Sequence, residues 1–304
     1  MARSRIAPIA GALTTRPAVF AASLLLVSCS GGIEEVSDRM VDVGTHRLHL
    51  CRQGEGSPAV IIDVGIGDQS EHWAPLRERI AERTLVCTYD RAGYGSSEPG
   101  PLPRDSGQVA AELKTLLQRA GIPGPYVLVG HSLGGLNMQV FVGAFPEDVA
   151  GLVLLDPPPL SWIGGERYPE LRRMAEQMTR QWRDTADASA QSSDPQERAQ
   201  AAFFRMLVSE HEQMFGISAE QAGRIATFGD IPLLVIASGQ PNPMFGEVAE
   251  EYQRYWVEQS RLLAGKSTNG RFVFAEESSH NLYADEPELV LENILSVVSE
   301  VRGR

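Results

Sequence analysis

The 304-residue sequence lacks the patterns that would assign it to a fibrous, cofactor-binding or nucleic-acid-binding class. It has no repeat or low-complexity tract, which excludes solenoid and fibrous folds. A phosphate-binding surface needs clustered Lys and Arg, and instead the chain carries a net charge of -12, which argues against a nucleic-acid partner. No phosphate loop, dinucleotide glycine fingerprint or metal-spaced set of His and Cys is present. We therefore expect no cofactor and no metal.

The chain also lacks an apolar run long enough to span a bilayer, although a short one lies near its beginning. Arginines without any acidic residue precede the apolar residues 17–27, as in a signal peptide. The tetrad LVSC at 26–29 resembles the bacterial lipobox, whose Cys becomes the lipid-modified first residue of the mature protein. The resemblance implies a signal peptide over residues 1–28 and membrane attachment through a lipidated Cys29, on the periplasmic or cell-surface side of a bacterial envelope. An ordinary secretory signal that ends near a Cys is the alternative.

Strand and helix patterns alternate along most of the remaining chain. Apolar, β-branched runs such as 59–64 and 84–90 are typical of strands buried on both faces. The amphipathic stretch 106–120, closed by Gly121, predicts a helix. Such alternation specifies a doubly wound, mostly parallel sheet with helices on both faces, an α/β fold. Eight strands are predicted, at 40–43, 47–52, 59–64, 84–90, 126–130, 150–155, 231–237 and 271–275.

The alternation is interrupted after Asp156 by three consecutive prolines and about seventy residues without strand signals. Helices are predicted there over 166–184, 194–214 and 218–227. We interpret this insertion as a cap over the carboxyl edge of the sheet, where ligands bind in such folds. The chain then divides into a signal peptide (1–28), a tether (29–39), a first core part (40–156), the helical cap (157–230) and a second core part (231–304).

Residues 130–135 (GHSLGG) match the pattern G-x-S-x-G between a predicted strand and a predicted helix. On such an elbow the serine adopts a strained backbone conformation, and Gly130 and Gly134 let strand and helix approach closely. The helix N-terminus also favours developing negative charge. We predict that Ser132 is a nucleophile, and a glycine-rich turn without chemistry is the alternative.

A serine hydroxyl is inert at neutral pH unless a base takes its proton. Of the six histidines, His280 stands in a polar loop directly after the last predicted strand, and in a doubly wound sheet this loop rises beside the elbow. We therefore predict that His280 is the general base. His131 is expected to point away from the reaction, and His211, within Ser-Glu-His-Glu, to lie on a solvated helix face.

The base needs a carboxylate to hold its tautomer and to stabilise the imidazolium. The commonest place is the loop after strand 231–237, but residues 238–243 contain no carboxylate. Asp156, directly after strand 150–155, is the position that the geometry of the fold permits, and we predict it as the acid. An Asp that only caps the turn is the structural alternative. Glu247 is a weaker rival.

Two backbone N–H groups are needed to stabilise an oxyanion. We predict those of Leu133, which follows the nucleophile, and of Ile66, in the glycine-flanked loop after strand 59–64. The cap supplies Met and aromatic residues that suit an apolar substrate group, although at helical spacing such residues more often serve packing. The residues assigned to a substrate pocket are Trp162, Met178, Phe203 and Phe204.

The segment 59–157 resembles the α/β-hydrolase family of esterases and lipases. Residues 89–97 (YDRAGYGSS) are similar to the family's D-R-x-G-x-G-x-S turn, residues 130–135 to its nucleophile elbow, and residues 279–288 to its base loop and last helix. The resemblance implies the strand order 1-2-4-3-5-6-7-8, a Ser-Asp-His triad, and hydrolysis of a small-molecule ester through an acyl-enzyme. The expected substrate is a carboxylic ester with an apolar group. A peptidase or lactonase with the same triad, and a non-catalytic binding protein on the same fold, are the alternatives.

Two positions depart from the family pattern, and whether one pair of cysteines forms a disulfide stays open. Val64-Gly65 replaces the usual His-Gly of the oxyanion loop, which leaves the backbone donor intact, and the usual late acid is missing. The implied strand order makes the strands of Cys51 and Cys87 neighbours, so a cross-strand disulfide is one outcome and two buried free thiols the other.

Overall fold

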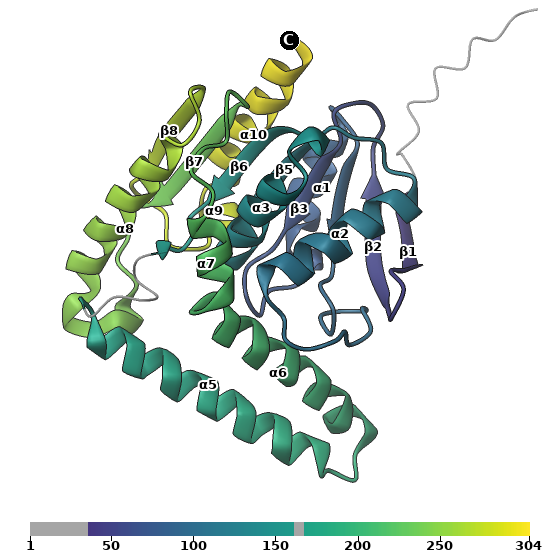
Figure 1. Cartoon of the computed structure of the whole chain (residues 1–304), viewed down its shortest axis with the longest axis vertical. Coiled ribbons are helices and arrows are strands. Elements are labelled where there is room, and N and C mark those ends of the chain that lie inside the picture. Colours follow the sequence, from purple (N-terminus) through teal and green to yellow (C-terminus); the bar gives the residue numbers. More distant parts are fainter. Residues whose placement is uncertain (1–35, 161–166) are drawn as a thin grey trace, which may run out of the picture. The chain divides into compact units, whose positions relative to one another are not determined.

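The computed structural model describes residues 36–160 and 167–304 (Figure 1). The predicted signal peptide, Cys29 and Trp162 lie outside these ranges, and what the sequence predicts for them stays a prediction. Among the described residues, no helix combines the length and the apolar character that crossing a bilayer requires.

Within the described ranges, eight strands form one sheet in the order β1-β2-β4-β3-β5-β6-β7-β8. The hairpin β1–β2 and the pair β2–β4 are antiparallel, and all other neighbours are parallel. The predicted strand order and the mostly parallel sheet are therefore confirmed. The strands are β1 (Ser37–Asp42), β2 (Arg47–Gln53), β3 (Val60–Asp63), β4 (Val86–Tyr89), β5 (Tyr126–His131), β6 (Val149–Leu155), β7 (Leu233–Ser238) and β8 (Gly270–Ala275).

Helices cover both faces of the sheet (Figure 1). Because successive strand residues point to opposite faces, Ile61 packs with helices α2 and α3, whereas Val60 and Ile62 pack with α1 and α10. Helix α2 ends at Gly121, whose φ of 69° is left-handed as a glycine cap requires. These helices are α1 (Ala74–Ala81), α2 (Ser106–Ala120), α3 (Leu133–Ala144) and α10 (Pro287–Arg302). The second part of the core also contains α8 (Ala249–Ala264) and α9 (Leu282–Asp285), which precede α10.

Helices α5 (Pro169–Ala190), α6 (Pro195–Met214) and α7 (Ile217–Gly223) lie between β6 and β7. Helices α5 and α6 run antiparallel to one another (Figure 1). The predicted range 166–184 for α5 is wrong at its end, because the helix continues to Ala190. The helix starts with a proline at its first position, which suits a helix start. The start of the sheet also differs from the prediction. Strand β1 begins at Ser37, so the last three residues of the predicted tether 29–39 belong to the sheet.

Cys51 and Cys87 are buried free thiols, so the disulfide alternative is wrong. The strands are neighbours as implied, but Cys51 lies opposite Thr88, and Cys87 lies opposite Arg52. An offset of one residue places the two cysteine side chains on opposite faces of the sheet. Burial raises the pKa of both thiols to about 12.

His211 is buried between α5 and α6, and the prediction of a solvated helix face is wrong. Its Nδ1 lies 2.7 Å from Thr179 Oγ1, and its ring makes edge contacts with Trp182 and Phe215. Burial lowers the pKa of His211 to about 4. The imidazole is therefore neutral in the folded protein near neutral pH.

We expect His211 to make the protein less stable in acid. Its folded pKa lies below the unfolded value of 6.5, so its contribution to stability is complete above pH 6.5 and is lost as pH falls toward 4. The loss between pH 7 and pH 4.5 corresponds to about 2 to 3 kcal/mol. Urea unfolding of wild type and His211→Gln at both pH values measures it. The prediction fails if both proteins lose the same free energy of unfolding.

Candidate active site

Ser132 occupies the turn between β5 and α3 with φ 53° and ψ -122°, a conformation that is costly for a residue with a side chain. The neighbouring glycines explain why the turn is so tight. A Cβ at Gly134 would lie 2.2 Å from the Asp63 carbonyl oxygen, and one at Gly130 would lie 2.5 Å from the Gly134 oxygen. The hydroxyl is thereby presented at the N-terminus of α3, where the helix dipole favours negative charge.

Asp156 and His280 are in direct contact. Asp156 Oδ2 lies 2.6 Å from His280 Nδ1, which leaves Nε2 as the ring atom that can take up a proton. The carboxylate also accepts hydrogen bonds from Ser238 N (2.9 Å) and Ser238 Oγ (2.8 Å). The Asp156 side chain is 3% exposed and that of His280 is 35% exposed, so the base reaches solvent while the acid does not.

The backbone of Asp156 explains how the end of β6 can supply this carboxylate. Its N–H donates to Ile236 O across the sheet (2.7 Å), and its φ of 46° turns the chain sharply out of the strand. Ser238, the last residue of β7 and directly before the loop where an acid is commonest, binds the Asp156 carboxylate and is itself held by Gln253. Glu247 is exposed, and among the described residues no contact joins it to His280.

His131 lies against the base loop. Its Nε2 donates to the His280 carbonyl oxygen (2.8 Å), and the two rings are 4.9 Å apart. Burial, and then the charge of His280, lower the pKa of His131 to about 4, so this ring stays neutral. Within the described residues, no hydrogen bond joins Ser132 Oγ to the His280 ring, and contacts of this kind commonly tighten only when substrate binds.

The loop after β3 forms a tight turn over residues 65–68, here called the oxyanion turn. Asp68 N donates to Gly65 O (3.4 Å), and Gly67 has a φ of 74°, as in a type II turn. A Cβ at Gly65 would lie 3.5 Å from Ser132 Cβ, so the turn carrying Ile66 rests directly on the elbow. Leu133 is the first residue of α3, and its N–H therefore has no acceptor within the helix.

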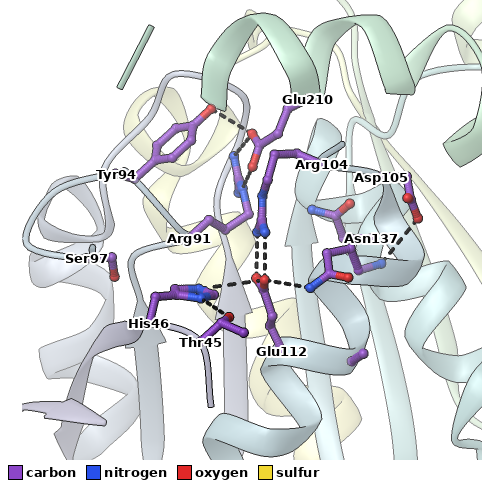
Figure 2. Close-up of polar contacts among 12 residues, drawn as sticks. Thr45, His46, Arg91, Tyr94, Ser97, Arg104, Asp105, Glu112, Asn137 and Glu210 are labelled. Atoms are coloured by element: carbon purple, nitrogen blue, oxygen red, sulfur yellow. Dashed lines mark hydrogen bonds and ion pairs between the residues drawn. The ribbon is translucent and has the colours of Figure 1, made fainter. Parts of the chain in front are cut away.

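A buried ionic cluster supports the oxyanion turn, and Figure 2 shows two of its members, Arg91 and Glu210. Arg91, from the D-R turn after β4, lies 2.7 Å from Asp63 Oδ1 and 2.9 Å from Glu210 Oε1 of α6. Burial alone would lower the pKa of Arg91, but Glu210 and Asp63 raise it well above its usual value, so the guanidinium is charged. Arg91 belongs to a motif that is visible in the sequence. No sequence pattern identified Glu210, which stands beside His211 on the helix face expected to be solvated.

Asp68 connects the oxyanion turn to the segment that follows the base. It accepts hydrogen bonds from Trp73 Nε1 (3.2 Å) and Tyr283 OH (3.1 Å), whose rings stack with centroids 4.3 Å apart. Burial alone would raise the pKa of Asp68, but the hydrogen bonds that it accepts outweigh burial and lower it. No sequence pattern identified this carboxylate, because its partners come from distant segments.

Two of the predicted pocket residues lie near the oxyanion turn. Phe203 and Phe204 of α6 belong to an apolar cluster that includes Ile66, and the Phe203 ring meets Tyr94 edge-on at 5.2 Å. Met178, on α5, is partly exposed and is not part of that cluster. The pocket prediction therefore groups residues that the structure only partly brings together.

The arrangement combines a hydroxyl on a strained elbow, an imidazole oriented by a carboxylate, and backbone N–H groups beside the hydroxyl. These are the parts required for nucleophilic acyl transfer. In the described part of the chain, no three side chains among His, Cys, Asp and Glu are placed to hold a metal ion.

Comparisons with known proteins agree with this geometry. A family model described as "Alpha/beta hydrolase family" matches residues 60–293. The uncharacterized protein YqjL of Bacillus subtilis is 27% identical over 246 residues, which cover 81% of this chain and 84% of YqjL. Lipase LipV of Mycobacterium tuberculosis is 35% identical over 111 residues, 36% of this chain and 41% of LipV. The solved structure of a thermophilic esterase from Thermogutta terrifontis has a TM-score of 0.65 at 20% identity, covers 88% of this chain and 99% of its own, and shows a shared fold.

Proposed function

Since the chain belongs to the alpha/beta hydrolase family, we propose that it is a serine hydrolase that cleaves a carboxylic ester through an acyl-enzyme on Ser132. The observation that carries the proposal is the 2.6 Å contact between His280 and Asp156, at the same edge of the sheet as the strained Ser132 elbow. A bare glycine-rich turn would need neither partner.

In the proposed reaction, Ser132 Oγ attacks the ester carbonyl while His280 Nε2 takes the hydroxyl proton. Asp156 stabilises the imidazolium, and the N–H groups of Ile66 and Leu133 bind the oxyanion of the tetrahedral intermediate. As the intermediate collapses, the ester C–O bond breaks and His280 gives its proton to the alcohol. Water then attacks the acyl-enzyme with His280 as base, which releases the carboxylic acid and restores Ser132.

The surroundings of the oxyanion turn favour an apolar group on the ester. Ile66, Phe203 and Phe204 belong to one apolar cluster beside the turn, and Tyr94 is one of its buried members. Lipase and esterase are the activities in the names of LipV and of the Thermogutta terrifontis protein, which supports the ester over the alternatives. Peptide or lactone hydrolysis would use the same triad, and a binding protein would have no need of the oriented base.

Labelling with a fluorophosphonate probe tests the proposal. The full-chain wild type is expected to become labelled, and Ser132→Ala to remain unlabelled, because the probe reacts with an activated serine. Ser96→Ala is the matched control, since Ser96 is exposed and contributes only its backbone N–H to a hydrogen bond with Asp90. Folded wild-type protein that stays unlabelled would overturn the proposal.

A further inference from the structure

Arg91 uses all five N–H donors of its guanidinium. Nε and Nη2 bond to Glu210 (2.9 and 3.2 Å), and Nη1 bonds to Asp63 Oδ1 and to Val64 O (both 2.7 Å). The remaining Nη2 donor bonds to Gly65 O (2.9 Å). The side chain is fully buried and has no unused donor, so its position is fixed by these partners.

The Gly65 carbonyl lies in the same planar peptide as the Ile66 N–H. In a trans peptide the C=O and N–H bonds point in opposite directions, so the bond from Arg91 to Gly65 O sets the direction of the Ile66 N–H. A charged donor on the carbonyl also polarises the peptide, which strengthens its N–H as a hydrogen-bond donor. Arg91 therefore acts on the proposed oxyanion donor through one peptide plane.

The next peptide plane, between Ile66 and Gly67, is held by Tyr94, whose contact with Glu210 is drawn in Figure 2. The Gly67 N–H donates to Tyr94 OH (3.3 Å), and Tyr94 OH donates to Glu210 Oε2 (2.7 Å). Ile66 is thus held through the peptide on each side of it, and both attachments lead to the Glu210 carboxylate.

Helix α6, which carries Glu210, also packs closely on these loops. A Cβ at Gly93 would lie 2.4 Å from Met206 Cγ, and a Cβ at Gly67 would lie 3.6 Å from Leu207 Cδ1. The helix belongs to the segment inserted between β6 and β7, whereas the turn belongs to the core of the sheet. Glu210 is therefore an ionic link between the inserted helices and the oxyanion turn.

We propose that Glu210 is a positioning residue for this enzyme: through Arg91 and Tyr94 it orients the Ile66 N–H toward the developing oxyanion. The inference rests on the proposed function, because it concerns the oxyanion of that reaction. Its consequence is that the oxyanion site is complete only while α6 is seated on the core.

The test compares three full-chain variants in the hydrolysis of p-nitrophenyl butyrate. Glu210→Gln removes the charge at nearly constant shape, and Tyr94→Phe removes only the hydroxyl. Displacing one oxyanion donor should lower kcat about 10- to 100-fold with little change in KM, because the contact matters only in the transition state. Glu212→Gln is the matched control, since Glu212 lies on the same helix but is exposed and pairs with Arg183.

The rate of fluorophosphonate labelling should fall in parallel, and the final extent of labelling should stay that of wild type. The double variant Glu210→Gln/Tyr94→Phe should lose little more than Glu210→Gln alone, because both side chains act on one turn. Wild-type kcat in both single variants, or a raised KM at unchanged kcat, would overturn the inference while wild-type labelling upholds the proposed function. If Glu210→Gln does not fold, Tyr94→Phe decides. An unlabelled wild type would overturn the proposed function instead.

Discussion

Asp156→Asn is expected to lower kcat about 10⁴-fold while the protein stays folded. An amide can no longer hold the Nδ1 proton of His280, so the imidazole loses the tautomer that leaves Nε2 free, and the imidazolium loses its counter-charge. The fold should tolerate the change, because the Asn oxygen can still accept the hydrogen bond from Ser238 N. Steady-state hydrolysis of a p-nitrophenyl ester, with circular dichroism as a check on folding, measures the effect.

The rival acid provides the control for this experiment. Glu247→Gln alters the carboxylate that was the weaker candidate for the acid, and it should leave kcat unchanged because Glu247 is exposed. Full activity in Asp156→Asn together with loss of activity in Glu247→Gln would reverse the assignment of the acid.

Gly134→Ala is expected to have the largest effect on stability. The added methyl carbon would lie 2.2 Å from the Asp63 oxygen and 2.6 Å from the Asp63 carbonyl carbon, which are backbone atoms of β3 and have no rotamer to change. Strand and helix must separate to admit it, at a cost of about 3 kcal/mol in the free energy of unfolding. The midpoint of urea unfolding reports this loss.

A second glycine separates this clash from the ordinary effect of an added methyl group. A Cβ added at Gly223, in α7, would meet no described atom within 4 Å apart from its own helix backbone and chain neighbours, and this glycine has no positive φ. Gly223→Ala should therefore match or slightly exceed the wild-type midpoint. A Gly134→Ala variant that unfolds at the wild-type midpoint would show that strand and helix are not in close contact at the elbow.

The parts of the fold that the sequence predicts well have strong local signals. Helix α2 has an amphipathic pattern with a glycine cap, and its predicted range 106–120 agrees with the structure. The disulfide alternative for Cys51 and Cys87 failed for a different reason. The strand order could be inferred, but the facing of two side chains depends on a register of one residue, which no pattern in the two strands determines.

The candidate site likewise contains residues that the sequence predicts and residues that it does not. Ser132, Asp156 and His280 each follow the carboxyl end of a strand, and such ends meet at one edge of a parallel sheet, so their proximity could be predicted. Asp68 and Glu210 acquire their roles from partners far away in the sequence. The sequence neighbours of Glu210 also predicted the wrong environment, since a run of polar residues on a helix normally indicates exposure.

The position of Asp156 has a consequence for protein engineering. The chain leaves the sheet at this residue and returns to it at β7. If the helices between these two points are replaced by those of another protein, the proposed nucleophile, acid and base all lie outside the replaced segment. A chimera joined downstream of Asp156 would therefore keep the residues of the proposed reaction and acquire a new selectivity. The replacing segment must, however, present a carboxylate to Arg91 where Glu210 does so here. Without that carboxylate, the chimera would have a new binding surface but an impaired oxyanion site.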